Sequence, residues 1–250
     1  MPTTTISEVL SALDEIISVE ISKNSPMAYF PILYREVTAR IAEGVANNEF
    51  ENGSRMETLD VIFANRYLVA YQDYQVNKPI TKSWKNAFDA STNGKLLIMQ
   101  HLLLGINAHI NLDLGIAVAL TVGENGNMKN IENDFNKINE ILSEMVAGVE
   151  AKIIKVSPLF GLLDKWGKGK EDKLVSFSIN VARDGAWLFA NQFHIAVDHE
   201  DEAIQRDIII SKLAKKLITQ KSFLLKWLVK IIRFFEKKNV GEVTSVLQQS

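Results

Sequence analysis

Apolar side chains recur every three or four residues along most of the chain, and this spacing is typical of amphipathic α-helices. Residues 5–22 show it plainly, with Ile6, Val9, Leu13 and Ile17 on one face. No segment alternates apolar and polar side chains over enough residues to predict a strand. The sequence therefore predicts an all-α fold.

Prolines, glycines and capping residues divide this pattern into separate helices. Ser54 with Glu57 three residues later is a capping-box pattern, and it predicts the start of a long helix. The glycine-rich, charged stretch 161–173 is the expected excursion from the bundle. We expect a single domain over 1–250 with a core at 25–200 and C-terminal helices at 201–248 packed on it. The bundle should contain about eight or more helices, at residues 5–22, 31–47, 54–77, 84–90, 96–122, 129–156, 173–199, 201–220 and 222–238.

The two most apolar segments, 96–122 and 173–199, are expected to be the central helices. Polar residues such as Gln100, Asn107 and Asp113 interrupt the first of them. A bilayer would penalise that many polar groups, so we expect a buried core helix and no stable membrane insertion.

Composition narrows the classes of function. The chain has 250 residues, and its 28 basic and 30 acidic residues leave no broad positive field to attract nucleic acid. The lack of cysteine excludes disulfides, thiolate nucleophiles and Cys-ligated zinc. The first residues do not read as a secretory signal, so a cytoplasmic location is expected.

Each central helix carries a His-x-x-x-Asp pair, His109 with Asp113 and His194 with Asp198. On a helix of 3.6 residues per turn, the two members of a pair lie about 40° apart on one face. They can ligate a metal together, or the Asp can fix the His tautomer and raise its basicity. A buried His beside a carboxylate can also be only a hydrogen-bonded pair of the core, so both interpretations stay open.

The second pair belongs to a polar row with heptad-type spacing, where a packed helix normally places Leu or Ile. Unless this row faces solvent, it predicts a polar cavity between the two central helices. The row consists of Asp184, Trp187, Asn191, His194 and Asp198.

The segment 222–238 is a basic amphipathic helix, with Lys226, Lys230, Arg233 and Lys237 among Leu, Ile, Trp and Phe. Such a helix can lie on an anionic membrane. We expect it instead to dock on the core of its own chain with its lysines in solvent.

Three phrases of the sequence resemble a bacterial all-helical family known as a domain of unknown function: residues 34–71, 100–119 and 181–193. The resemblance covers about residues 25–200 and implies no activity. The His-x-x-x-Asp spacing is also similar to that of the helical zinc phospholipase C and S1/P1 nuclease group, which holds zinc ions that activate water against phosphoesters. The chain lacks that group's N-terminal Trp ligand, its secretory signal and its number of histidines.

The leading hypothesis is an intracellular helical enzyme in which the two His-x-x-x-Asp pairs bind a divalent metal, Zn, Mn or Fe, for hydrolysis of an ester or phosphoester. Its catalytic candidates are His101, His109 and Asp184. The residues expected to contact the small-molecule substrate are Arg66, Tyr67, Tyr71, Arg183, Trp187 and Asn191.

Two alternatives require no metal. In one, a cavity lined by Tyr67, Tyr71, Trp187 and Phe193 binds a small apolar or aromatic molecule, and the His109 pair is an acid–base couple. In the other, the chain is a non-enzymatic interaction protein whose pairs are core hydrogen bonds.

Overall fold

The computed structural model describes residues 2–161, 178–219 and 223–249, and within these ranges the chain forms helices and no strand. The predicted all-α fold is confirmed. A π-helical turn, η3 (His109–Leu114), joins α5 to α6, and short 3-10 turns, η1 (Pro26–Ala28) and η2 (Ala90–Thr92), precede α2 and follow α4. The α-helices are α1 (Ile6–Ser22), α2 (Tyr29–Ala46), α3 (Gly53–Gln75), α4 (Lys82–Asp89), α5 (Ile98–Ala108), α6 (Gly115–Val122), α7 (Lys129–Val156), α9 (Ile179–His194), α10 (His199–Ile218), α11 (Phe223–Phe235) and α12 (Val240–Leu247).

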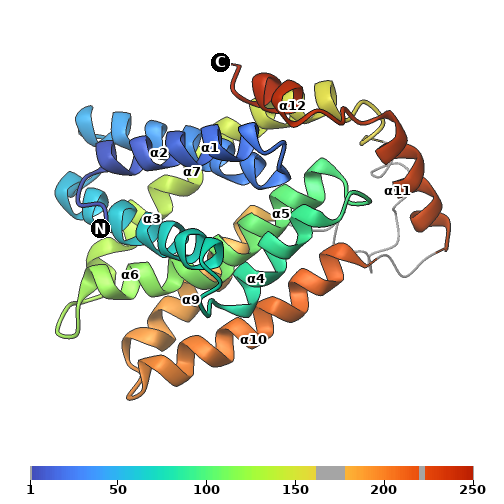
Figure 1. Ribbon diagram of the computed structural model, residues 1–250. Helices are drawn as coiled ribbons and strands as arrows, with labels where there is room; N and C mark the ends of the chain where they lie inside the picture. Colours follow the sequence, from blue (N-terminus) through green and yellow to red (C-terminus); the bar gives the residue numbers. More distant parts are fainter. Residues whose placement is uncertain (1, 162–177, 220–222, 250) are drawn as a thin grey trace.

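The continuous rod made by α5, η3 and α6 is the centre of the fold. It contacts α2 and α3 on one side and α4, α9 and α10 on the other, while α1 and α2 lie side by side above it (Figure 1). The segment Ile98–Val122 is long and apolar enough to cross a bilayer, but its position inside the fold accounts for that composition equally well. The predicted central position of the helix 96–122 is confirmed.

Two glycines allow neighbouring helices to approach this rod closely. A Cβ atom on Gly105 would lie 2.5 Å from Cγ of Phe30 in α2, and one on Gly115 would lie 2.9 Å from the carbonyl oxygen of Ala186 in α9. Both distances are shorter than van der Waals contact. Glycine at these positions therefore sets how tightly α2 and α9 pack on the central rod.

Several predicted boundaries are corrected. The helix predicted at 173–199 ends at His194, and Asp198 caps the next helix by accepting a hydrogen bond from the backbone N–H of Asp201. Its predicted start, like nearly all of the predicted excursion 161–173, lies outside the described residues. Helix α3 is capped by Asn52, whose side chain accepts from the Arg55 N–H, rather than by Ser54.

Buried carboxylates from distant parts of the chain accept hydrogen bonds from backbone N–H groups at the starts of three helices. Asp134 of α7 accepts from the backbone N–H groups of Glu51 and Asn52, just before α3. Asp207 of α10 accepts from the first N–H groups of α4, and Glu236 accepts from the Ile98 N–H at the start of α5. A carboxylate is favourable there because the first N–H groups of a helix lack partners and carry partial positive charge.

The C-terminal helices pack on the rest of the bundle. Helix α10 contacts α4 and α5, and α12 contacts α7, α2 and α1. Helix α11 buries Leu225, Leu228, Val229 and Ile232 in an apolar cluster with side chains of α5 and α10. Helix α11 therefore lies against the bundle through this one face.

Candidate functional site

The first His-x-x-x-Asp pair lies in the centre of the core, where η3 carries both residues. Asp113 accepts hydrogen bonds of 2.7 Å from Nε of Arg66 in α3 and 2.7 Å from Nε1 of Trp84 in α4. Burial raises the pKa of the Asp113 carboxyl, but the adjacent Arg66 charge and the hydrogen bonds outweigh burial and hold the pKa below its ordinary value. Asp113 is therefore an ionised carboxylate that ties three helical segments together.

The imidazole of His109 is enclosed by aromatic rings. It stacks on Phe63 with 3.6 Å between ring centroids and meets Tyr34 edge-on at 4.4 Å. Its Nδ1 lies 3.6 Å from Oδ2 of Asp113, which is too long for a hydrogen bond, and neither ring nitrogen has a hydrogen-bond partner among the described residues. Burial lowers the pKa of His109, so its ring is neutral near pH 7.

His109 forms part of the wall of a large apolar cavity of about 610 Å³. Helices α2, α3, α5 and α7, η3 and the first turns of α9 supply its other walls. Small-molecule sites in proteins typically enclose 300–1,000 Å³ and have mostly apolar walls with a few polar groups. Its apolar lining includes Phe30, Leu33, Val37, Ile41, Met56, Leu59, Phe63, Met99, Leu102, Leu103, Ile106, Ile110, Leu114, Ile138, Leu142, Met145, Val149 and Phe160.

Two more buried polar groups line the same cavity without a hydrogen-bond partner in the described part of the chain. They are the hydroxyl of Tyr34 and Oδ2 of Asp60, one helical turn before Phe63. Burial raises the pKa of Asp60 to about 7, with a smaller contribution from the charge of Glu57. We call Tyr34, Asp60 and His109 the polar cluster.

Asp60 is an exception among the acidic side chains that are buried in the described ranges. Glu20 accepts hydrogen bonds from Tyr71 and Lys23, Asp113 is bonded as above, and the other three cap helices. Among these acids, Asp60 is the one with a fully buried carboxylate oxygen that has no hydrogen-bond partner in the described part of the chain. The buried acids are Glu20, Asp60, Asp113, Asp134, Asp207 and Glu236.

Arg183, a predicted substrate-binding residue, lies in the cavity wall. Its Nη2 donates to the carbonyl oxygen of Phe135 at 2.9 Å, its Nε donates to Asn139, and its guanidinium lies over the Phe135 ring. Burial lowers the pKa of Arg183 to about 9. The charge of Asp184, whose side chain is exposed, acts in the opposite direction and raises this pKa by less than burial lowers it. These partners are neutral, so the guanidinium presents a positive charge to the cavity wall.

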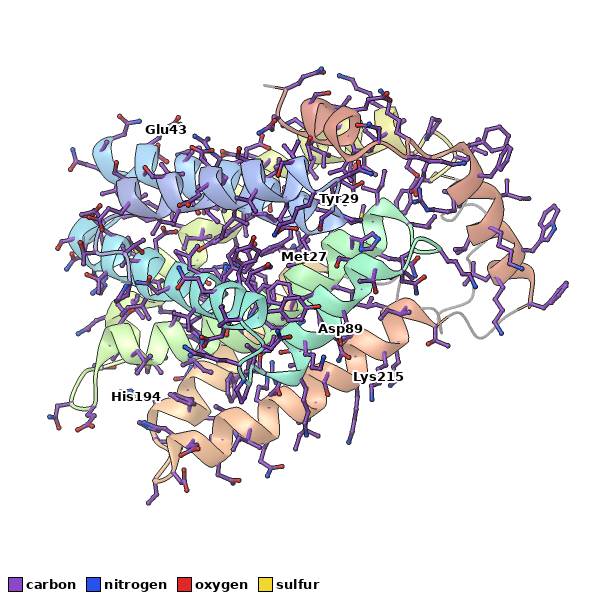
Figure 2. All side chains as sticks on the ribbon, in the orientation of Figure 1. Met27, Tyr29, Glu43, Asp89, His194 and Lys215 are labelled. Atoms are coloured by element: carbon purple, nitrogen blue, oxygen red, sulfur yellow. The ribbon has the colours of Figure 1, made fainter. Side chains whose placement is uncertain are left out.

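The second His-x-x-x-Asp pair lies elsewhere. Figure 2 shows His194 at the edge of the molecule, and its Nε2 lies 3.2 Å from the carbonyl oxygen of Gly126. Asp198 is exposed and caps α10. The described residues contain no group of three or more His, Cys, Asp or Glu side chains placed to hold a metal ion, so the four predicted ligands do not converge.

The polar row of α9 does not line the expected cavity between the central helices. Asp184 is exposed, and Trp187, Asn191 and His194 are half-buried. The expectation of a buried seam is wrong because α9 turns Ala186, Phe189 and Ala190 toward the central rod instead. The observed cavity is enclosed mainly by α2, α3, α5 and α7, and α9 reaches it only with its first turns.

The other predicted residues do not line the observed cavity. His101 packs against Tyr29, and burial lowers its pKa to about 4. Tyr67 packs between Phe30 and Trp84 in the aromatic core, and Tyr71 donates its hydroxyl to Glu20 at 2.7 Å. Arg66, Trp187, Asn191 and Phe193 are also absent from its wall.

Asp60 and Tyr34 are the functional candidates that the sequence-based analysis missed. The sequence does contain one signal for Asp60, because it shares a helix face with Ala64, Tyr67 and Tyr71, and all three are buried. An acidic side chain on an otherwise apolar and aromatic face marks a buried carboxyl.

Comparison with protein families assigns most of the chain to a known family. The model of a family described as a family of unknown function (DUF5995) matches residues 6–220. No curated protein and no solved structure matches the chain.

Proposed function

This chain belongs to the DUF5995 family, and we propose that it binds a small apolar molecule carrying a hydroxyl or carbonyl group. The apolar body of the ligand occupies the 610 Å³ cavity, and its polar group contacts the polar cluster. The observation that carries the proposal is that four buried atoms of the polar cluster have no hydrogen-bond partner within the described residues: the Tyr34 hydroxyl oxygen, Oδ2 of Asp60 and both ring nitrogens of His109. Buried polar atoms are nearly always hydrogen-bonded, so exceptions that share one cavity favour a missing external partner.

The chemistry of the polar cluster favours a neutral polar group in the ligand. Below pH 7 the Asp60 carboxyl keeps its proton and can donate a hydrogen bond, because burial raises its pKa to about 7. The Tyr34 hydroxyl can donate or accept, and the neutral His109 ring offers one donor and one acceptor. A hydroxyl or carbonyl satisfies such a set without bringing a further charge into the core.

Binding is tested with four ligands of the same chain length: a long-chain alcohol, the alkane, the amine and the carboxylic acid. Isothermal titration should show the alcohol binding more tightly than the alkane. Asp60→Asn with His109→Gln should reduce this preference while leaving alkane binding unchanged. If the alcohol and the alkane bind equally, the role of the polar cluster is wrong. If the amine bound most tightly, the ligand would be a cation paired with Asp60. If the acid bound most tightly, the ligand would be an anion paired with Arg183.

A cavity-filling variant separates binding inside the cavity from binding elsewhere. Val37, half-buried on α2, lines the cavity, and Val37→Trp would place an indole in the space of the ligand. We expect it to abolish binding of the alcohol while the variant keeps its cooperative thermal unfolding. A folded Val37→Trp protein that binds like the wild type would refute the cavity as the site.

Metal-dependent hydrolysis is less well supported by the donor geometry. Both Asp113 oxygens already accept hydrogen bonds, one from Arg66 and one from Trp84. In the second pair, His194 lies at the edge of the molecule in Figure 2 and Asp198 is exposed. A shared site would require both pairs within a few ångströms of one ion, since metal–ligand bonds are about 2 Å long. Stoichiometric Zn, Mn or Fe in gently purified protein, lost in Asp113→Asn, would restore that hypothesis.

A further inference from the structure

The outward face of α11 is unusually apolar for a protein surface. Its opposite face packs in the core, yet Phe223 is 86% exposed, Trp227 is 57% exposed and Phe234 is 70% exposed. The helix lies at the edge of the molecule in Figure 1. Contiguous exposed apolar surface of this kind usually marks an interaction site.

The exposed aromatic side chains form a single stripe that includes a lysine. At 3.6 residues per turn, Phe223, Trp227, Lys230 and Phe234 fall within about 60° around the helix. Lys226 is exposed on the flank of this stripe, about 60° from Phe223. We call these five residues the aromatic–lysine face.

Basic charge is concentrated on this part of the chain. Residues 223–238 contain five basic residues and one acidic residue, whereas the whole chain has 28 basic against 30 acidic residues. The acidic residue is Glu236, which is buried beneath the helix and accepts a hydrogen bond from Ser157. The exposed charge around α11 is therefore positive, while the remainder of the chain has an acidic excess.

We propose that the aromatic–lysine face docks α11 on an anionic lipid surface. Trp and Phe side chains partition into the headgroup region of a bilayer, and nearby lysines are attracted to anionic lipids. The face is the convex outer side of a helix. Proteins that bind single-stranded nucleic acid instead use a positively charged groove that follows the backbone, with aromatic rings inside it.

Docking on this face would bring the membrane near the cavity. Met99, Leu103 and Phe160 belong both to the apolar cluster beneath α11 and to the cavity wall. If the proposed ligand binding is correct, docking would place the cavity wall one helix away from the layer where amphiphilic molecules concentrate. Docking itself requires only the outer face of α11, so it stands or fails independently of the ligand.

Vesicle co-sedimentation of the full chain tests the proposal. We expect the protein to pellet with phosphatidylcholine vesicles containing phosphatidylglycerol and to remain in the supernatant with phosphatidylcholine alone. Higher salt should weaken pelleting because it screens the lysines. Lys226→Glu with Lys230→Glu, and separately Trp227→Ser with Phe234→Ser, should each weaken binding by at least about tenfold.

The matched control is Lys212→Glu with Lys216→Glu, which makes the same charge change at the same four-residue spacing on the exposed surface of α10. It should bind anionic vesicles within about twofold of the wild type, since it leaves the aromatic–lysine face intact. Equal weakening by the control would reduce the proposal to general electrostatics and overturn it. Equal pelleting with neutral vesicles would also overturn it.

Separate measurements test two other binding partners for this face, a second copy of the chain and a nucleic acid. Self-association in sedimentation velocity that Trp227→Ser with Phe234→Ser abolishes would assign the face to a second copy of the chain. Oligonucleotide binding without vesicle binding would assign it to nucleic acid. Either result would overturn the lipid assignment. Val37→Trp should bind vesicles like the wild type, so failure of ligand binding and failure of docking can be told apart.

Discussion

Replacing Asp60 by asparagine should stabilise the protein in alkaline solution and much less in acid. Burial raises the pKa of the Asp60 carboxyl from its ordinary value of 3.8 to about 7. The unfolded chain releases this proton near the ordinary pKa, whereas the folded chain releases it only near 7. Stability from Asp60 is therefore full below about pH 4 and is lost as the pH rises through 7.

The size of the effect follows from these two pKa values. A tenfold difference in proton affinity corresponds to about 1.4 kcal/mol. For a carboxyl whose pKa is 3.8 unfolded and about 7 folded, the free energy of unfolding should fall by roughly 2–3 kcal/mol between about pH 5 and about pH 8. The amide side chain of the Asp60→Asn variant does not titrate in this range, so the advantage of the variant should grow by the same amount.

Urea unfolding of both proteins at several pH values measures this difference. The carboxyl of Glu236, whose pKa burial also raises to about 7, loses stability in the same direction. It is present in both proteins, so its contribution cancels in the comparison. Glu57→Gln is a control that removes only the lesser cause of the Asp60 pKa and should give a smaller change of the same sign. A stability advantage of Asp60→Asn that is equal at all pH values would refute the reasoning.

Two further predictions concern packing and buried hydrogen bonds. Asp113→Ala leaves Arg66 and the Trp84 N–H without their acceptor, and it should lower the free energy of unfolding, measured in urea, by about 3 kcal/mol. Asp113→Asn keeps one acceptor and should lower it by less. Equal losses in the two variants would contradict the role given to these hydrogen bonds. Gly115→Ala forces α6 away from α9 and should cost about 1–3 kcal/mol, while Gly148→Ala, on the exposed surface of α7, should stabilise by about 0.5–1 kcal/mol. Thermal unfolding in the opposite order would refute the close contact of α6 with α9.

The helical pattern predicts the fold well because local periodicity determines which face of each helix is buried. The expected helix 129–156 is observed at Lys129–Val156, and the apolar segment 96–122 is the centre of the bundle. Periodicity does not reveal that this segment contains the π-helical turn His109–Leu114. In a π-helix the side chains take different angles around the axis from those of an α-helix, so the facing of His109 and Asp113 could not be calculated from a spacing of 3.6.

Whether the two His-x-x-x-Asp motifs meet in the fold could not be predicted from the sequence, for a different reason. Equal spacing places His and Asp on one face of each segment, but it does not determine how the two segments meet. Gly115 lets the backbone of α9 approach closely at Ala186 and Ala190, and the polar row of α9 lies away from this contact, half-buried or exposed. The decisive residue was thus a glycine, which carries no chemical signal of its own.

The partners of the buried acids also depend on tertiary contacts. Asp134 meets the start of α3 from more than eighty residues away, and Glu236 meets the start of α5 across a still longer separation. Glu236 satisfies the first N–H group of α5, and Asp134 satisfies the two N–H groups that directly precede α3. Once these acids are accounted for as caps, Asp60 stands apart, because its carboxyl faces a cavity rather than a helix end. The other buried acids have hydrogen-bond partners within the protein, whereas Asp60 faces an apolar cavity of about 610 Å³. This contrast favours the hypothesis that the partner of Asp60 is a bound ligand.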